Sequence, residues 1–97
     1  MVFEWDEEKN EENIRTHGLD FGYAQEVFNA PMLIRSDTPK NYDEDRFVGI
    51  GFLRNFVVVI VYTERAKDTI RVISLRKALK HERQRFEEAL RNQLGEA

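Results

Sequence analysis

The longest apolar run of the sequence, residues 56–62, limits most strongly the folds that the chain can adopt. Its five inner residues are all valine or isoleucine, whose β-branched side chains pack well on a pleated sheet. A continuous apolar run of this length is typical of a strand that is covered on both faces. We therefore expect residues 56–62 to be the central strand of a sheet.

The segments on either side of this run also have the composition of strands. Residues 46–53 precede it across a short hairpin at Arg54-Asn55, and residues 69–74 follow it after a turn at 66–68. Shorter strands are expected at residues 2–5 and 32–35. The sequence thus predicts an α+β fold with an antiparallel, mainly meander sheet of four to five strands.

Alternation along these strands predicts which side chains share a face. Gly49 and Gly51 share one face of their strand, where a packed helix, a ligand or a bulge would explain them. The central strand and the last strand are expected to be antiparallel and joined by the turn at residues 66–68. Arg65 would then lie near this turn and Arg76 toward the far end of the last strand, so the two are expected to lie apart. In the last strand, one face is expected to carry Ile70, Val72, Ser74 and Arg76, and the other Arg71, Ile73 and Leu75.

Three helices are expected, two before the meander and one after it. Asp6 is suited to cap a helix over residues 7–17, and Gly18 is suited to end it. Asp20 is suited to cap a second helix over residues 21–29. The C-terminal helix is expected to begin at Lys77 or Ala78.

Length and composition limit the class of protein. A chain of 97 residues is expected to form one domain over residues 1–97. It has no cysteine, which excludes disulfides and thiolate metal sites and fits a reducing cytoplasm. The central run is about a third of the ~20 residues that a membrane helix needs, so we expect an untargeted, soluble, cytoplasmic protein without a membrane partner.

The net charge of −3 conceals a strong asymmetry along the chain. Residues 1–45 carry four basic and twelve acidic side chains, whereas residues 46–97 carry eleven basic and six acidic ones. The basic excess is highest over residues 65–85, which could hold a phosphate backbone. A solvated charged surface would explain the same pattern.

The first helix has an unusual polar face. Lys9, Asn13 and His17 recur every fourth residue, which places an ammonium, an amide and an imidazole on one side. These groups could form part of a binding site. Alternatively, this is a polar surface helix in which Asn13 and His17 bond to nearby backbone groups.

Five strings in order resemble the BrnT toxin family over nearly the whole chain. They are residues 3–9 with Asn13 and 15–21, residues 46–51, residues 62–65, residues 71–78, and Glu82-Arg83. Two positions differ from the family pattern: Phe86 stands where relatives often have tyrosine, and Leu75 where a small residue is usual.

The resemblance implies a toxin of a bacterial type II toxin-antitoxin pair. It implies a fold similar to the RelE ribonucleases and an activity on RNA that stops translation. It also implies a partner antitoxin, BrnA, with a ribbon-helix-helix DNA-binding domain, so that DNA is contacted through the antitoxin.

Cleavage of RNA without a metal or other cofactor needs a base for the 2′-hydroxyl, charge stabilisation at phosphorus, and protonation of the leaving 5′-oxygen. We expect His17 or Glu64 to be the base and Arg65 and Arg76 to stabilise the phosphorane. Neighbouring phosphates are expected to contact Lys9, Arg71 and Arg83. The competing hypothesis is a non-enzymatic interaction module whose arginines bind a partner protein.

Overall fold

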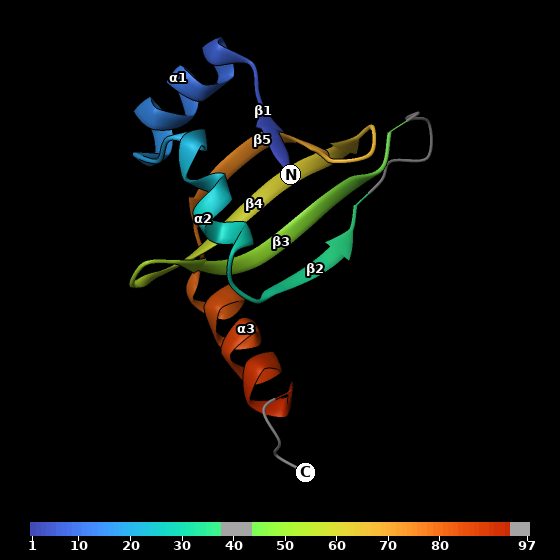
Figure 1. Cartoon of the computed structure of the whole chain (residues 1–97). Coiled ribbons are helices and arrows are strands. Elements are labelled where there is room, and N and C mark those ends of the chain that lie inside the picture. Colours follow the sequence, from blue (N-terminus) through green and yellow to red (C-terminus); the bar gives the residue numbers. More distant parts are fainter. Residues whose placement is uncertain (38–43, 94–97) are drawn as a thin grey trace.

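A five-stranded sheet forms the centre of the computed structural model, which describes residues 1–37 and 44–93 (Figure 1). The strands are β1 (Val2–Glu4), β2 (Met32–Ser36), β3 (Arg46–Leu53), β4 (Phe56–Arg65) and β5 (Thr69–Lys77). Their order is β1-β5-β4-β3-β2, so the apolar run forms the middle strand, as predicted.

The sheet is mixed. Strands β2 to β5 pair antiparallel, and β3, β4 and β5 form the predicted meander. The first strand, β1, instead pairs with β5 in parallel, starting from a 2.7 Å bond between Val2 N–H and the Asp68 carbonyl. The expected antiparallel arrangement therefore does not extend to β1, because three residues give no signal for strand direction.

The helices differ in part from the prediction. Helix α1 (Glu7–His17) has the expected ends, with Asp6 as its N-cap and Gly18 at a φ of 73° as its C-cap. The expected second helix is divided into a 3-10 turn, η1 (Phe21–Tyr23), and a short α2 (Ala24–Phe28). Helix α3 (Lys80–Gln93) begins later than expected, because β5 continues to Lys77.

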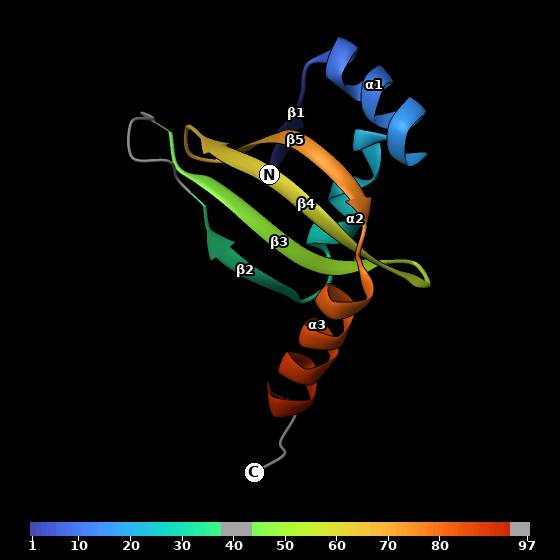
Figure 2. The same cartoon turned by 180° about the vertical axis from the view of Figure 1, so that it is seen from behind.

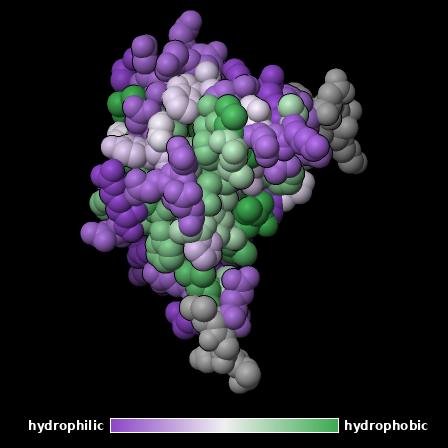
Figure 3. Space-filling model, viewed as in Figure 1, coloured by the Kyte–Doolittle hydropathy of each residue, from purple (hydrophilic) through white to green (hydrophobic). Residues whose placement is uncertain are grey.

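The main core lies between one face of the sheet and the segment η1-α2. Phe21, Val27, Ile60 and Leu75 are fully buried there. Figure 3, viewed as in Figure 1, shows apolar surface over the middle of this side of the molecule. Gly51 lies beneath α2, where a Cβ atom would come within 2.9 Å of Met32 Cγ. A packed helix, with Met32 beside it, thus explains the glycine.

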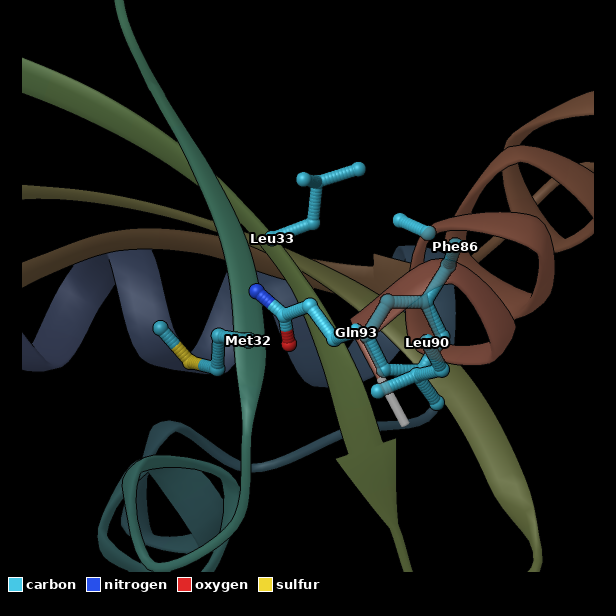
Figure 4. Close-up of a pocket in the computed structure, with 6 residues that line it drawn as sticks. Met32, Leu33, Phe86, Leu90 and Gln93 are labelled. Carbon is cyan, nitrogen blue, oxygen red and sulfur yellow. The ribbon is translucent and has the colours of Figure 1, made fainter. Parts of the chain in front are cut away.

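Helix α3 packs across the opposite face near one end of the sheet and then extends away from it (Figure 2). Its Phe86 is 1% exposed and meets Phe52 edge to face at 5.0 Å. Figure 4 shows Phe86, Leu90 and Gln93 beside Met32 and Leu33 of β2. The space they enclose is only about 10 Å³, so the contact is closely packed. No helix in the described part of the chain is long and apolar enough to cross a membrane.

Candidate functional site

Many of the basic side chains gather on the sheet face opposite α2. Paired residues of adjacent strands lie on the same face of a sheet, so the register shows which side chains lie there. We call this the arginine face, seen from the viewpoint of Figure 2. It includes Arg35 of β2, Arg46, Val48 and Ile50 of β3, Val59, Val61, Thr63 and Arg65 of β4, and Thr69, Arg71, Ser74 and Arg76 of β5.

A β-bulge produces this arrangement in β5. Val61 pairs with Ser74, but its neighbour Tyr62 pairs with Val72, so Ile73 is an extra residue in the ladder. A bulge changes the alternation beyond it. The predicted separation of Arg71 from Arg76 onto opposite faces is therefore wrong, and both belong to the arginine face.

One row of residues crosses four strands. Glu4, Arg71, Thr63 and Arg46 lie side by side on β1, β5, β4 and β3. Arg71 Nη1 lies 3.1 Å from Glu4 Oε2. Arg65, just beyond the row, places its Nε 2.9 Å from Glu44 Oε2 and 3.9 Å from Glu4 Oε2. These side chains are between 32% and 45% exposed, so solvent screens the pairs and an anionic ligand can compete for the guanidiniums.

Arg76 is held more firmly. Its Nη1 and Nη2 donate to the two oxygens of Glu82 at 2.8 and 2.9 Å, and Leu79 N–H donates to Glu82 Oε1 at 2.8 Å. The hydrogen bonds from Arg76 lower the pKa of Glu82 from 4.5 to about 2. Arg76 pairs with Val59 of β4. Val59 lies six residues before Arg65, a distance of about 20 Å along β4. The two arginines lie at opposite ends of the strand pair, as predicted, and do not converge on one phosphodiester.

His17 and Lys9 line a hollow between α1 and β5. Its volume is about 200 Å³, and Asn13, Thr16 and Ile73 complete much of its wall. Ile73 directly precedes Ser74, so the hollow lies beside the β5 edge of the arginine face. His17 and Lys9 are exposed, whereas Asn13 is 6% exposed and bonds to backbone groups. For Asn13, the alternative interpretation, in which this side chain bonds to backbone groups, is therefore correct.

Two of the predicted site residues lie outside this arrangement. Glu64 pairs with Ile70 on the core face and lines a separate hollow with Lys67 and Thr69. Arg83 is exposed on α3, three residues before Phe86, rather than on the sheet. Within residues 1–37 and 44–93, no three histidine, aspartate or glutamate side chains group as metal ligands.

Comparison with known proteins decides the family. The family described as the ribonuclease toxin BrnT of type II toxin-antitoxin systems matches residues 5–82 of the chain. The chain belongs to the BrnT toxin family. A search of curated protein sequences gave no match.

A solved structure supports this assignment. The crystal structure of the Brucella abortus ribonuclease toxin BrnT is similar to this BrnT-family chain, with a TM-score of 0.62 and 25% sequence identity. The similarity covers 82% of this chain and 100% of the Brucella chain. It shows that the mixed sheet and its helices form the fold of a BrnT toxin.

The two departures from the BrnT pattern are both core positions. Phe86 is buried against Phe52, so its ring serves packing. Leu75 has 0% exposure and pairs with Ile60, away from the arginine face. The bulk of Leu75 therefore does not narrow the arginine face.

Sequence reasoning missed four members of the site. Arg46 and Thr63 belong to the central row, and Arg35 and Arg85 border an apolar hollow of about 180 Å³ with Val48 and Ile50 in its wall. A two-residue hairpin at Arg54-Asn55 places Leu53 opposite Phe56, and counting back places Arg46 opposite Thr63. The predicted hairpin was thus a sufficient signal for Arg46 and Thr63, whereas Arg85 depends on the docking of α3.

Proposed function

We propose that this BrnT-family chain cleaves RNA at the arginine face, without a metal ion, by attack of the 2′-hydroxyl on the neighbouring phosphorus. The observation that supports this most strongly is that Arg46, Arg65 and Arg71 share one face beside the hollow of His17 and Lys9. Guanidiniums in such a group can bind successive phosphates and stabilise the added charge of a phosphorane.

His17 is the preferred base. It lies at the β5 edge of the arginine face, whereas Glu64 lies on the core face. Arg71 and Arg76 lie on either side of Ile73, the β5 residue that lines the hollow, at two and three residues from it, or about 7 and 10 Å along the strand. The proposed site for the reacting phosphodiester is therefore between these two guanidiniums, near Ser74.

The proposed reaction moves one proton at each end. His17 takes the proton of the 2′-hydroxyl, the 2′-oxygen forms a bond to phosphorus, and the bond from phosphorus to the 5′-oxygen breaks. Lys9, in the same hollow, donates a proton to the leaving 5′-oxygen or holds the adjacent phosphate. The products are a 2′,3′-cyclic phosphate and a 5′-hydroxyl. Arg65 and Arg46 bind phosphates farther along the strand, and Arg83 contacts RNA that passes α3.

The partner in this proposal is a BrnA-like antitoxin with a ribbon-helix-helix domain, acting with the toxin in the cytoplasm. A type II toxin-antitoxin family implies a protein antitoxin. Acidic side chains of the antitoxin would exchange with Glu4 and Glu44 on the exposed arginines and so block RNA. Contact with DNA would then come from the antitoxin, consistent with the net charge of −3 of this chain.

Mapping of RNA ends tests the activity. The purified full chain should cleave RNA in EDTA and leave 2′,3′-cyclic phosphate ends. His17→Ala should lower the rate about 10²–10⁴-fold, and Arg71→Ala about 10²–10³-fold. The chain has two histidines, so His81→Ala is a matched control that should retain the wild-type rate.

Two results would contradict the proposal. Cleavage that requires a divalent cation would remove the metal-free mechanism, and equal rates for wild type and His17→Ala would remove the base. A chain that binds its antitoxin tightly but leaves RNA intact, and that does not arrest growth when expressed alone, would favour the interaction module.

A further inference from the structure

Thr63 has a buried hydroxyl group that the fold does not use. The residue is 7% exposed, and its Oγ1 has no hydrogen-bond partner among the residues that the structure describes. A buried donor without a partner lowers stability, and valine would fill a similar volume without that cost. A buried hydroxyl without a partner needs an explanation, and a bound ligand would supply one.

The neighbours of Thr63 indicate the charge of this ligand. Arg46 on β3 and Arg71 on β5 are the residues directly opposite Thr63 on either side, and all three share the arginine face. Adjacent strands are about 4.8 Å apart, so the two long cationic side chains flank the hydroxyl. Arg71 already contacts an anionic oxygen, Glu4 Oε2, at 3.1 Å. The group beside Thr63 is thus expected to be an anion with several acceptor oxygens.

We propose that Arg46, Thr63 and Arg71 form a binding site for one phosphate group of the RNA backbone, to which the Thr63 hydroxyl donates a hydrogen bond. This inference rests on the proposed ribonuclease function and adds to it a subsite next to the reacting phosphodiester, with Arg71, whose guanidinium has several donors, between the two phosphates. A phosphodiester has two charged oxygens, which matches two guanidiniums and a hydroxyl donor. In this site the phosphate would displace Glu4 from Arg71, whose Nη1 it contacts at 3.1 Å.

Thr63→Val in the full chain tests the site. The probe is an RNA oligonucleotide with 2′-O-methyl groups, which binds but lacks the hydroxyl that attacks phosphorus. We expect the affinity of Thr63→Val for this probe to fall about tenfold, because a hydrogen bond to a charged group is lost. Its Tm should rise by a few degrees, because an unpartnered hydroxyl has been removed from the interior.

Two further variants control for packing and for location. Thr63→Ser keeps the hydroxyl, so it should bind the probe within about threefold of wild type. Tyr23→Phe also removes a hydroxyl, but on η1 at the opposite side of the sheet, and should leave the affinity within about twofold. If Thr63→Val does not fold, Thr63→Ala replaces it in the same comparison.

The outcomes separate this inference from the proposed function. Wild-type affinity in Thr63→Val, with a raised Tm, would overturn the phosphate site while the wild type still binds and cleaves RNA. Failure of the wild type itself to bind the probe would overturn both. Inorganic phosphate is a second probe, measured by the rise in Tm that it causes. If Thr63→Val loses this rise but keeps its affinity for RNA, the site holds a free anion and the inference fails.

Discussion

At the scale of single residues, buried asparagines attach α1 to the molecule in place of an apolar stripe. Asn13 Nδ2 donates to the carbonyls of Leu19 and Leu75 at 2.9 and 2.8 Å, and its Oδ1 accepts from Leu75 N–H at 3.2 Å. Pairing of β1 with β5 ends at Arg71, so Asn13 bonds the edge of β5 beyond it. The carboxamide of Asn13 thus makes the two hydrogen bonds to Leu75 that a neighbouring strand would otherwise make.

Asn13→Ala should lower the free energy of unfolding by about 2–4 kcal/mol, because several buried backbone groups lose their partner. Urea denaturation monitored by circular dichroism measures the change. Glu11→Ala, at an exposed position of the same helix, should change stability by less than about 0.5 kcal/mol. Equal midpoints for these two variants would show that the Asn13 bonds contribute little.

Glu82 and Arg76 make stability depend on pH. The pKa of Glu82 is about 2 in the folded protein against 4.5 ordinarily, so its contribution is complete above pH 4.5 and is lost as the pH falls toward 2. The partly exposed pair is screened, which reduces the effect to about 1–2 kcal/mol. Glu82→Gln should therefore be less stable at pH 7 and lose less stability between pH 5 and 2. Parallel pH profiles for the two proteins would contradict this.

At the scale of elements, the bulge in β5 determines which side chains share a face. Leu75 and Val72 both enter the core although they are three positions apart, and Arg71 and Arg76 both point to the other face. Bulges are common next to functional sites because they redirect side chains. Here the single extra residue, Ile73, also lines the hollow that contains His17.

The close approach of β2, β3 and α2 requires glycine at position 51. Gly51→Ala should cost about 1–3 kcal/mol, since the added Cβ would lie 2.9 Å from Met32 Cγ and 3.4 Å from Val27 Cγ1. The free energy of unfolding of the single and double variants with Met32→Ala measures the coupling. The double variant should recover part of the loss, whereas strictly additive effects would show that Met32 is not the residue that Gly51 accommodates.

At the scale of the whole molecule, a chain with net charge −3 concentrates its arginines on one side of a sheet. Electrostatic binding of RNA depends on this local excess rather than on the net charge. Carboxylates of the chain itself, Glu4, Glu44 and Glu82, contact three of these arginines. Under the proposed function, RNA competes with these carboxylates, so its binding should be sensitive to salt.

Salt titration of RNA binding measures how many phosphates the arginine face neutralises. Three to four contacts predict a slope of log affinity against log salt of about −2 to −3 for single-stranded RNA. Arg71→Ala should make the slope shallower by about 0.7, and Arg15→Ala, on exposed α1, should leave it unchanged. A slope near zero for the wild type would contradict an electrostatic interface.

Local patterns were sufficient for much of the fold. The apolar run identified the central strand, and the capping residues Asp6 and Gly18 gave both ends of α1. These features depend only on residues a few positions apart, so they can be predicted from the sequence alone. The predicted separation of Arg65 from Arg76 also followed from antiparallel pairing alone.

The composition of the candidate site depended on longer-range contacts. Regular alternation along β5 predicted that Arg71 and Arg76 lie on opposite faces. The bulge at Ile73 places them on the same face, and no residue near Ile73 indicates this bulge in the sequence. Glu64 was expected at the same site as Arg65, although adjacent residues of a strand point in opposite directions. The direction of β1, which brings Glu4 to Arg71, likewise depends on pairing across 67 positions of the chain.

The sequence by itself therefore determined the strands of the meander, the caps of the first helix and, through its motifs, the toxin family. The tertiary structure alone decided which arginines lie together and which carboxylates contact them. The physical reason is that hydrophobic periodicity and capping act over a few residues, whereas a bulge, a strand direction and a docked helix depend on packing between distant segments.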